Sequence, residues 1–216
     1  MKKDWTGNKA AVFAIIGASN HSSSERQEHD YYATDPEALP PLLDYLVDNG
    51  LLRTVVGKKV WECACGEGHL SKKMEEKGMI VKSSDLILRG YGQSGVDFLK
   101  TTHADCGDNM IITNPPYKIA QEFVEHSLKI TNTGTLTCML LKLTFLEGQK
   151  RKKLFDKYPP LKVLVFSARQ KCAINGDFEN IGSSAICYAW FVWMKGFTGS
   201  PQIDWLNKET PHKRLL

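Results

Sequence analysis

A segment around residue 66 most constrains the fold of this 216-residue chain. An apolar run over residues 58–65 ends in Gly66-Glu67-Gly68, and a helical pattern follows over residues 70–77. A second apolar run over residues 79–83 leads to Asp85. Strand, glycine turn, helix, strand and acid in this order are typical of a βαβ unit, in which the acid accepts hydrogen bonds from ribose hydroxyls. We therefore predict an α/β fold that binds a nucleoside-type ligand at the carboxyl ends of its strands.

The glycine turn lacks the third glycine of the dinucleotide fingerprint, because Gly68 is followed by His69 and Leu70. That glycine permits close packing of helix and strand in pyrophosphate-binding folds. Its absence argues against NAD or FAD and favours an adenosine ligand without a pyrophosphate. A further acid, Asp97, is either a solvated turn carboxylate or an acceptor for the amino group of the ligand's adenine.

A second motif follows the apolar residues 111–113 and reads Asn114-Pro115-Pro116-Tyr117. Each proline holds the residue before it out of the helical region, and neither proline carries an N–H group, so the turn is stiff and rich in acceptors. The side-chain oxygen of Asn114 and the carbonyl of Pro115 can face one point in space, with the ring of Tyr117 beside them. This arrangement suits a planar ligand that bears an NH2 group. A strand that simply ends in an Asn-Pro turn is the alternative interpretation.

The N-terminal part divides into two regions. Residues 1–30 are expected to be a lead-in segment and not a cleaved signal, because their apolar stretch is short and Asp4 interrupts the basic residues. From residue 31 to residue 216 we expect a single domain. Asp35 and Pro36 predict the start of a helix, as N-cap and first helical residue, and Pro40-Pro41 permits a break in it.

The composition restricts the class of protein only broadly. The formal charge of +4 permits an anionic partner, and no apolar run is long enough to cross a membrane. Six cysteines, most of them in apolar runs of a chain too long to need disulfides, predict free thiols in a reducing cytoplasm. The cysteines and histidines lack the paired spacing of a structural zinc site, so we expect no metal.

Taken in order, Glu62 to Gly68, Asp85, Asp97 and Asn114 to Tyr117 resemble the motifs of S-adenosylmethionine-dependent methyltransferases that act on amino groups. The match is best with the DNA N6-adenine enzymes, particularly small ones of phage and prophage type. Residues 31–36 resemble the extra cofactor-binding motif of that family. The resemblance implies a Rossmann-like methyltransferase fold with a single mixed, mostly parallel seven-stranded sheet flanked by helices, in which the last strand is antiparallel.

The resemblance also implies roles for individual residues, with S-adenosylmethionine as the cofactor. The implied cofactor-binding residues are Tyr32, Pro36, Glu62, Cys65, Gly66, Gly68, Asp85 and Asp97. The implied catalytic residues are Asn114, Pro115, Pro116 and Tyr117. In these roles Asp85 binds the ribose hydroxyls and Asp97 the adenine amino group. Asn114 and Pro115 accept the hydrogens of the target amine, while Tyr117 stacks on the flipped-out base.

Substrate contacts are expected to be local, because full-size DNA enzymes of this family carry a target-recognition domain for which this chain has no room. One candidate is the basic run that opens a helix at residues 149–157, although such a run is often only a solvated face. The other is a polar loop at residues 169–184, between the last two expected strands. The predicted substrate-binding residues are Lys150, Arg151, Lys171, Asn175 and Phe178. Residues 196–216 are expected to form only a short tail.

The sequence therefore predicts an enzyme that methylates N6 of adenine in DNA, with low or short sequence specificity. An RNA adenine methyltransferase keeps the fold and the cofactor and changes the substrate, as does a protein glutamine N5 methyltransferase. The latter usually has an N-terminal substrate domain, for which residues 1–30 are too few. A nucleic-acid-binding module without catalysis is the third alternative, and the intact Asn114 to Tyr117 motif argues against it. The sequence does not predict an oligomeric state.

Overall fold

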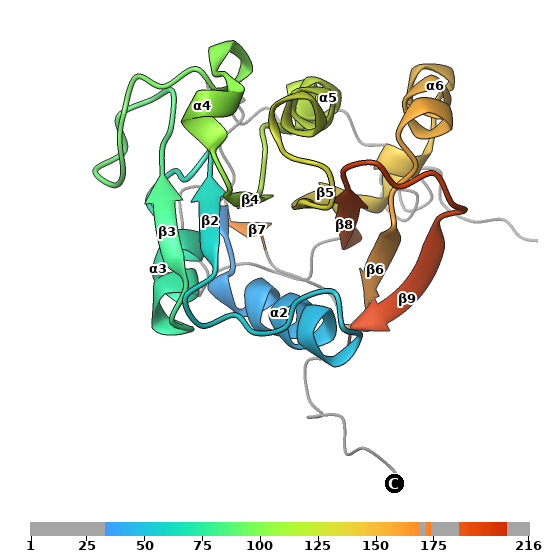
Figure 1. Ribbon diagram of the computed structural model, residues 1–216, viewed down its shortest axis with the longest axis horizontal. Coiled ribbons are helices and arrows are strands. Elements are labelled where there is room, and N and C mark those ends of the chain that lie inside the picture. Colours follow the sequence, from blue (N-terminus) through green and yellow to red (C-terminus); the bar gives the residue numbers. More distant parts are fainter. Residues whose placement is uncertain (1–32, 169–171, 174–185, 207–216) are drawn as a thin grey trace, which may run out of the picture.

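The computed structural model describes residues 33–168, 172–173 and 186–206. A seven-stranded sheet crosses the described part of the chain (Figure 1). Its strands are β2 (Lys59–Glu62), β3 (Ile80–Ser83), β4 (Met110–Thr113), β5 (Leu136–Lys142), β6 (Lys162–Phe166), β8 (Tyr188–Met194) and β9 (Gln202–Leu206). Their order across the sheet is β3-β2-β4-β5-β8-β6-β9. The short strands β1 (Ala33–Thr34) and β7 (Cys172–Ala173) pair antiparallel as a separate ladder.

The predicted α/β fold with a mixed, mostly parallel seven-stranded sheet is confirmed. Strands β2, β3, β4 and β5 pair in parallel, whereas β8 is antiparallel to both β5 and β6. The expectation of a short tail beyond residue 196 is wrong for residues 202–206, which form β9 parallel to β6 at the edge of the sheet. All five residues of this segment pair with residues 162–166 of β6.

Helices cover both faces of the sheet. They are α2 (Leu39–Asp48), α3 (His69–Glu76), α4 (His103–Cys106), α5 (Ala120–Ile130) and α6 (Gln149–Lys157). Short 3-10 helices are η1 (Pro36–Ala38), η2 (Phe98–Lys100), η3 (Tyr117–Ile119) and η4 (Leu143–Leu146). Figure 1 shows α4, α5 and α6 on one side of the sheet and α2 on the other. No helix in the described ranges is long and apolar enough to span a membrane.

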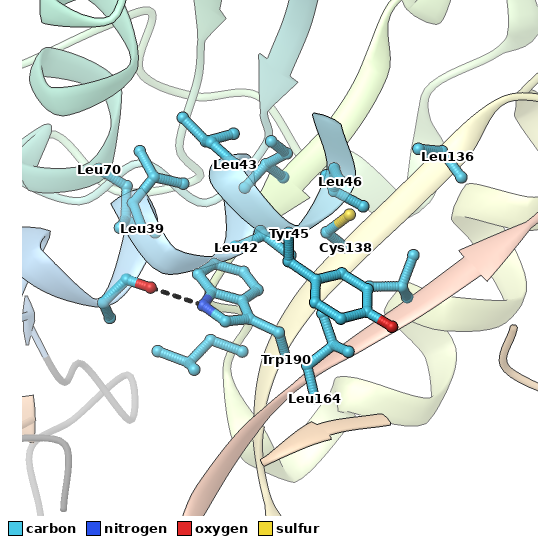
Figure 2. Close-up of a cluster of buried hydrophobic side chains, with 14 of the residues drawn as sticks. Leu39, Leu42, Leu43, Tyr45, Leu46, Leu70, Leu136, Cys138, Leu164 and Trp190 are labelled. Carbon is cyan, nitrogen blue, oxygen red and sulfur yellow. Dashed lines mark hydrogen bonds between the residues drawn. The ribbon is translucent and has the colours of Figure 1, made fainter. Parts of the chain in front are cut away.

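Strand β8 shows why the sheet needs cover on both faces. Trp190 and Val192 belong to the apolar cluster that contains α2 and α3, whereas Phe191 and Trp193 belong to the cluster on the side of α5. All four are fully or almost fully buried, as expected for a run that is apolar at every position. The indole Nε1 of Trp190 also donates to the carbonyl of Ala38, 2.8 Å away, which ties η1 to the centre of the sheet (Figure 2).

The start of the first helical region follows from its capping residues. Asp35 accepts a hydrogen bond from the N–H of Glu37 at 3.0 Å, and Pro36 opens η1. The break permitted at Pro40-Pro41 does not occur, and α2 runs from residue 39 to residue 48. Both prolines lie in the first turn of α2, where a missing N–H costs no intrahelical hydrogen bond.

The carboxyl ends of the four parallel strands define one edge of the molecule. They are Glu62 of β2, Ser83 of β3, Thr113 of β4 and Lys142 of β5. In parallel α/β sheets, ligands bind in the crevice outside these ends. The connections that leave this edge carry both motifs singled out in the sequence.

Candidate active site

A cavity of about 280 Å³ lies at this edge of the sheet. The predicted site residues that line it are Glu62, Cys65, Asp85, Asp97, Asn114, Pro115, Pro116 and Tyr117. Thr34, Leu86, Phe98 and Lys118 complete much of its wall. The structure therefore brings four of the predicted cofactor residues and all four predicted catalytic residues to one cavity. The predicted cofactor residues Gly66 and Gly68 are not among the residues of its wall.

The turn after β2 requires glycine for its conformation and for a close approach. Gly66 and Gly68 have positive φ angles of 54° and 80°, in the left-handed region that glycine adopts without strain. A Cβ atom at Gly68 would lie 2.3 Å from the ring of Tyr91. The turn thus packs directly under the loop that follows β3.

Asp85 holds the glycine turn from the end of β3. Its Oδ2 accepts from the N–H of Gly66 at 2.8 Å, and its Oδ1 accepts from the N–H of Ile87 at 2.9 Å. An ionised carboxylate has about four acceptor positions, so these two bonds leave capacity for hydroxyl donors from a ligand. The predicted binding of ribose hydroxyls by Asp85 remains a prediction.

Glu62 is a buried carboxyl group at the end of β2, with 2% of the residue exposed. It accepts a hydrogen bond from the hydroxyl of Ser71, whose Oγ also lies 2.6 Å from Oγ of Ser83. Burial raises the pKa of the Glu62 carboxyl to about 8, and the bond from Ser71 partly opposes this shift. A cationic group placed beside Glu62 would favour its ionised form. Ser71 was not predicted as a site residue, because its contact depends on the phase of α3.

Asp97 is a turn carboxylate that also lines the cavity, and its predicted contact with the adenine amino group remains a prediction. It caps η2 by accepting from the N–H of Leu99 at 3.1 Å, and it forms an ion pair with Lys100 at 3.0 Å. It also lines the cavity, beside Phe98. Phe98 is 2% exposed and packs edge-on against Trp61, so it forms a fixed apolar wall. Phe98 was not predicted as a site residue, and its place directly after Asp97 is the only indication of this role in the sequence.

The amide of Asn114 is held by a residue far away in the chain. Its Nδ2 donates to Oγ1 of Thr34, 2.8 Å away and 80 residues earlier. Thr34 lies in β1 and is 5% exposed. The sequence placed residues 31–36 near the cofactor but gave no indication that Thr34 contacts Asn114.

The ring of Tyr117 is fixed by two side chains from the central strands. Its centroid lies 6.0 Å from that of Tyr188, at an interplanar angle of 35°, and Nζ of Lys142 lies 4.7 Å from its centroid. Lys142 and Tyr188 are paired residues of β5 and β8. Tyr117 lines the cavity from this position, where it offers an aromatic surface to a planar ligand. Lys142 and Tyr188 were not predicted as site residues.

Other predicted residues lie away from the cavity wall or outside the described residues. Pro36 begins η1, and Lys150 and Arg151 lie in α6. Arg151 supports η4, because its Nη1 donates to the carbonyls of Thr144 at 2.7 Å and Glu147 at 3.2 Å. Lys150 is exposed. The predicted residues outside the described ranges are Tyr32, Lys171, Asn175 and Phe178.

The cysteines near the site behave as apolar side chains. Cys63 and Cys65 are buried free thiols that line the cavity, and burial raises the pKa of each, that of Cys65 to about 12. They therefore stay protonated at neutral pH. Within residues 33–168, 172–173 and 186–206, no group of three or more His, Cys, Asp or Glu side chains is arranged to hold a metal ion.

Comparison with known proteins shows the fold. No protein-family model and no curated protein sequence matches the chain. A type I restriction–modification methyltransferase subunit from Streptococcus thermophilus matches with a TM-score of 0.56 and 13% identity over 79% of this chain and 47% of that one. A proposed class I S-adenosylmethionine-dependent methyltransferase from Listeria monocytogenes matches with a TM-score of 0.56 and 13% identity over 92% of this chain and 71% of that one.

A third solved structure, a proposed RNA methyltransferase from Pyrococcus horikoshii, matches with a TM-score of 0.56 and 14% identity. The match covers 87% of this chain and 99% of that one. The chain thus spans about half of the Streptococcus subunit and nearly all of the Pyrococcus protein. At these identities the likeness shows the fold alone. The chain has the Rossmann-like fold of the class I methyltransferases.

Proposed function

We propose that this protein transfers the methyl group of S-adenosylmethionine to the N6 amino group of a flipped-out adenine in DNA, with low or short sequence specificity. One observation carries the proposal. The acids Glu62, Asp85 and Asp97 and the Asn114 to Tyr117 motif line the same cavity at the carboxyl edge of a methyltransferase-type sheet. A cofactor and an amine held in one cavity can be aligned for direct transfer.

The cavity wall fits the chemical groups of the cofactor. Glu62 offers a buried carboxyl group to the α-ammonium group, and Asp85 offers acceptors to ribose hydroxyls. Asp97 can accept from the adenine amino group, while Phe98 and Leu86 supply apolar contact. When bound, the cofactor supplies an electrophilic methyl group on a sulfonium.

The Asn114 to Tyr117 motif fits the other reactant. The lone pair of an exocyclic amine is delocalised into its ring, so the amine is a weak nucleophile. Two acceptors on its hydrogens, the side-chain oxygen of Asn114 and the carbonyl of Pro115, favour a pyramidal nitrogen and direct its lone pair. Alignment of this kind accounts for roughly 7–11 kcal/mol of barrier reduction in well-oriented reactions. Stacking on Tyr117 would offset part of the cost of taking the base out of the duplex, a few kcal/mol.

The DNA substrate is the more specific part of the proposal. The solved structures of similar fold include both a restriction–modification subunit and a proposed RNA enzyme, so they support either nucleic acid. The resemblance of the ordered motifs to small DNA N6-adenine enzymes favours DNA. Methylation of adenine in RNA or of a glutamine amide would use the same acceptors. The experiment below distinguishes these substrates from DNA.

The test is to express the protein in a host that lacks its own adenine methylation. DNA and RNA are digested separately to nucleosides, and methylated bases are quantified by mass spectrometry. We expect N6-methyldeoxyadenosine spread over several sequence contexts. An Asn114→Ala variant, which keeps the glycine turn, is the matched control and should give far less methylated base.

Two results would contradict the proposal. Methyladenosine confined to RNA would replace DNA by RNA as the substrate. Methyl transfer to protein with no methylated nucleoside in either pool would refute the nucleic-acid substrate altogether. Purified protein and methyl-labelled cofactor on DNA, RNA and total protein would repeat the comparison in vitro.

A further inference from the structure

The orientation of the Asn114 amide is a feature that the proposed function needs but does not by itself explain. The amide has an acceptor oxygen and a donor NH2 group on the same carbon atom. Only the oxygen can accept a hydrogen from a target amine. If the amide were turned by 180°, it would present its NH2 group instead, and this group would favour an acceptor such as a carbonyl or ring nitrogen.

In the structure, the amide has the first of these two orientations. The NH2 group of Asn114 donates to the Thr34 hydroxyl at 2.8 Å, so the oxygen occupies the other corner of the planar amide. Both residues line the cavity. Thr34 is 5% exposed, and a hydrogen bond at a site from which water is largely excluded fixes a side chain more firmly than one in solvent.

The backbone around Thr34 is itself held in place. β1 pairs with β7, with Ala33 opposite Ala173 and Thr34 opposite Cys172. On the other side, Asp35 caps η1 directly after Thr34. The hydroxyl is therefore presented by a short strand that pairs with β7 and leads directly into the capped η1, which is the support that a positioning residue requires.

We infer that Thr34 is a positioning residue that holds the Asn114 side chain in place at the cavity wall for its proposed contact with the target amine. This inference rests on the proposed function. It gives β1 a role in the amine half of the site, beyond the cofactor contacts that the sequence implied for residues 31–36. Thr34 acts through Asn114 and needs no contact with the reacting atoms.

The test compares Thr34→Val, which keeps the shape and removes the hydroxyl, with Thr34→Ser, which keeps the hydroxyl. We expect Thr34→Val to lower kcat by ~10- to 100-fold, as small misplacements of catalytic groups do. The Kd for the cofactor and the thermal unfolding midpoint should change little, and Thr34→Ser should restore most of kcat. Thr131→Val is a matched control, because Thr131 is also 5% exposed and its hydroxyl bonds a backbone carbonyl at the end of α5. It should leave kcat unchanged.

A second readout does not depend on activity. The side-chain NH2 resonances of Asn114, identified by their loss in Asn114→Ala, report on the hydrogen bond in NMR spectra. One of the two protons should exchange faster and shift upfield in Thr34→Val, and it should return to its wild-type position in Thr34→Ser. Thr34→Ala is the second variant if Thr34→Val does not fold.

Several outcomes would overturn the inference. Unchanged kcat in Thr34→Val, or an unchanged amide spectrum, would show that Thr34 does not set Asn114. A loss of cofactor affinity as large as the loss of kcat would make Thr34 a cofactor contact. If the wild type methylates adenine and Thr34→Val has the same kcat, only the role of Thr34 is refuted. A wild type that methylates no amine refutes the proposed function, and the role of Thr34 in it as well.

Discussion

The two halves of the cavity are held in different ways. On the glycine-turn side, polar contacts join residues that are close in the chain or belong to one βαβ unit, as Asp85 does with Gly66 and Ile87. On the amine side, Asn114 depends on Thr34 from a separate strand 80 residues earlier. The first half is specified locally, whereas the second exists only when the tertiary structure is complete.

This difference predicts different costs of substitution. The acids of the first half support the backbone as well as facing the ligand, so their loss should reduce both stability and cofactor affinity. The amide of the second half is proposed to act on the reacting amine. Its loss should reduce turnover and leave the cofactor bound.

The largest effect is expected for Asn114→Ala. Its oxygen is proposed to act on the reacting nitrogen, and removal of one preorganised group of this kind costs about 100- to 1,000-fold in kcat. Cofactor affinity should stay near that of the wild type. Single-turnover kinetics and calorimetry would measure the two quantities. Near-normal turnover would show that the proline turn has only a structural role and would remove the contrast between the halves.

The next largest effect is expected for Asp85→Ala, which should lower both cofactor affinity and stability. The substitution leaves the N–H groups of Gly66 and Ile87 without their carboxylate acceptor, at about 1–3 kcal/mol of stability. Cofactor affinity should fall by about 2 kcal/mol or more, the loss of a ribose hydrogen-bond pair. Urea unfolding would measure the loss of stability, and titration calorimetry would measure the loss of cofactor affinity. Asp85→Asn keeps one acceptor and is expected to lie in between. Full cofactor affinity in Asp85→Ala would remove Asp85 from the ligand site.

The pH dependence of stability tests the role of Glu62 in the glycine-turn half of the cavity. Its pKa is raised from 4.5 to about 8 in the folded protein, so the folded state binds a proton more tightly than the unfolded chain. The resulting stabilisation is fully present below pH 4.5 and is lost as the pH rises to about 8. The slope can reach about 1.4 kcal/mol per pH unit. Urea unfolding of the wild type between pH 5 and pH 8, relative to Glu62→Gln, would measure it.

The opposite trend, a wild type that gains stability over the Gln variant as the pH rises, would mean that Glu62 is ionised in the folded protein. Cofactor binding extends the same test. If a cationic group of the cofactor contacts Glu62, binding near pH 7 should release a proton. Calorimetry in two buffers of different ionisation enthalpy would detect this release.

The smallest effects are expected in α6, outside both halves. Arg151→Ala should lower the free energy of unfolding by about 1 kcal/mol, because it removes the donor to the carbonyls of Thr144 and Glu147. Lys150→Ala is the matched control on the same helix and should leave stability unchanged. If Lys150 contacts a phosphate, its loss should reduce the salt dependence of DNA binding by about one unit of slope. Equal stability of the two variants would show that Arg151 does not support η4.

The sequence predicted the parts of the site that short segments specify. The order of strand, glycine turn, helix and acid placed Asp85 beside the turn, and the two prolines placed Asn114 and Tyr117 at the end of a strand. The contacts of Thr34 and Tyr188 could not be predicted, because they depend on which distant strands become neighbours. Ser71 was missed for a different reason, since a one-residue change in helix phase would turn it away from Glu62.

The edge strand β9 was missed because its signal is short. The strand has five residues, of which only residues 202–205 alternate between polar and apolar, and Ile203 and Trp205 remain more than half exposed. Backbone pairing with β6 therefore contributes more to the formation of this strand than burial of its side chains does. A pattern of hydrophobicity gives little warning of a strand that is held chiefly by its backbone.

The ladder between β1 and β7 has a consequence for the order in which the molecule assembles. It joins segments separated by roughly 140 residues, and closing such a loop in the unfolded chain costs about 4 kcal/mol of entropy. Two residue pairs, each contributing about 1 kcal/mol per hydrogen bond, offset little of that cost. We therefore expect the ladder to form only after α2 and β6 have docked and shortened the gap. On refolding, the tryptophan fluorescence of the core should recover first, and Asn114 should acquire its partner in the last step.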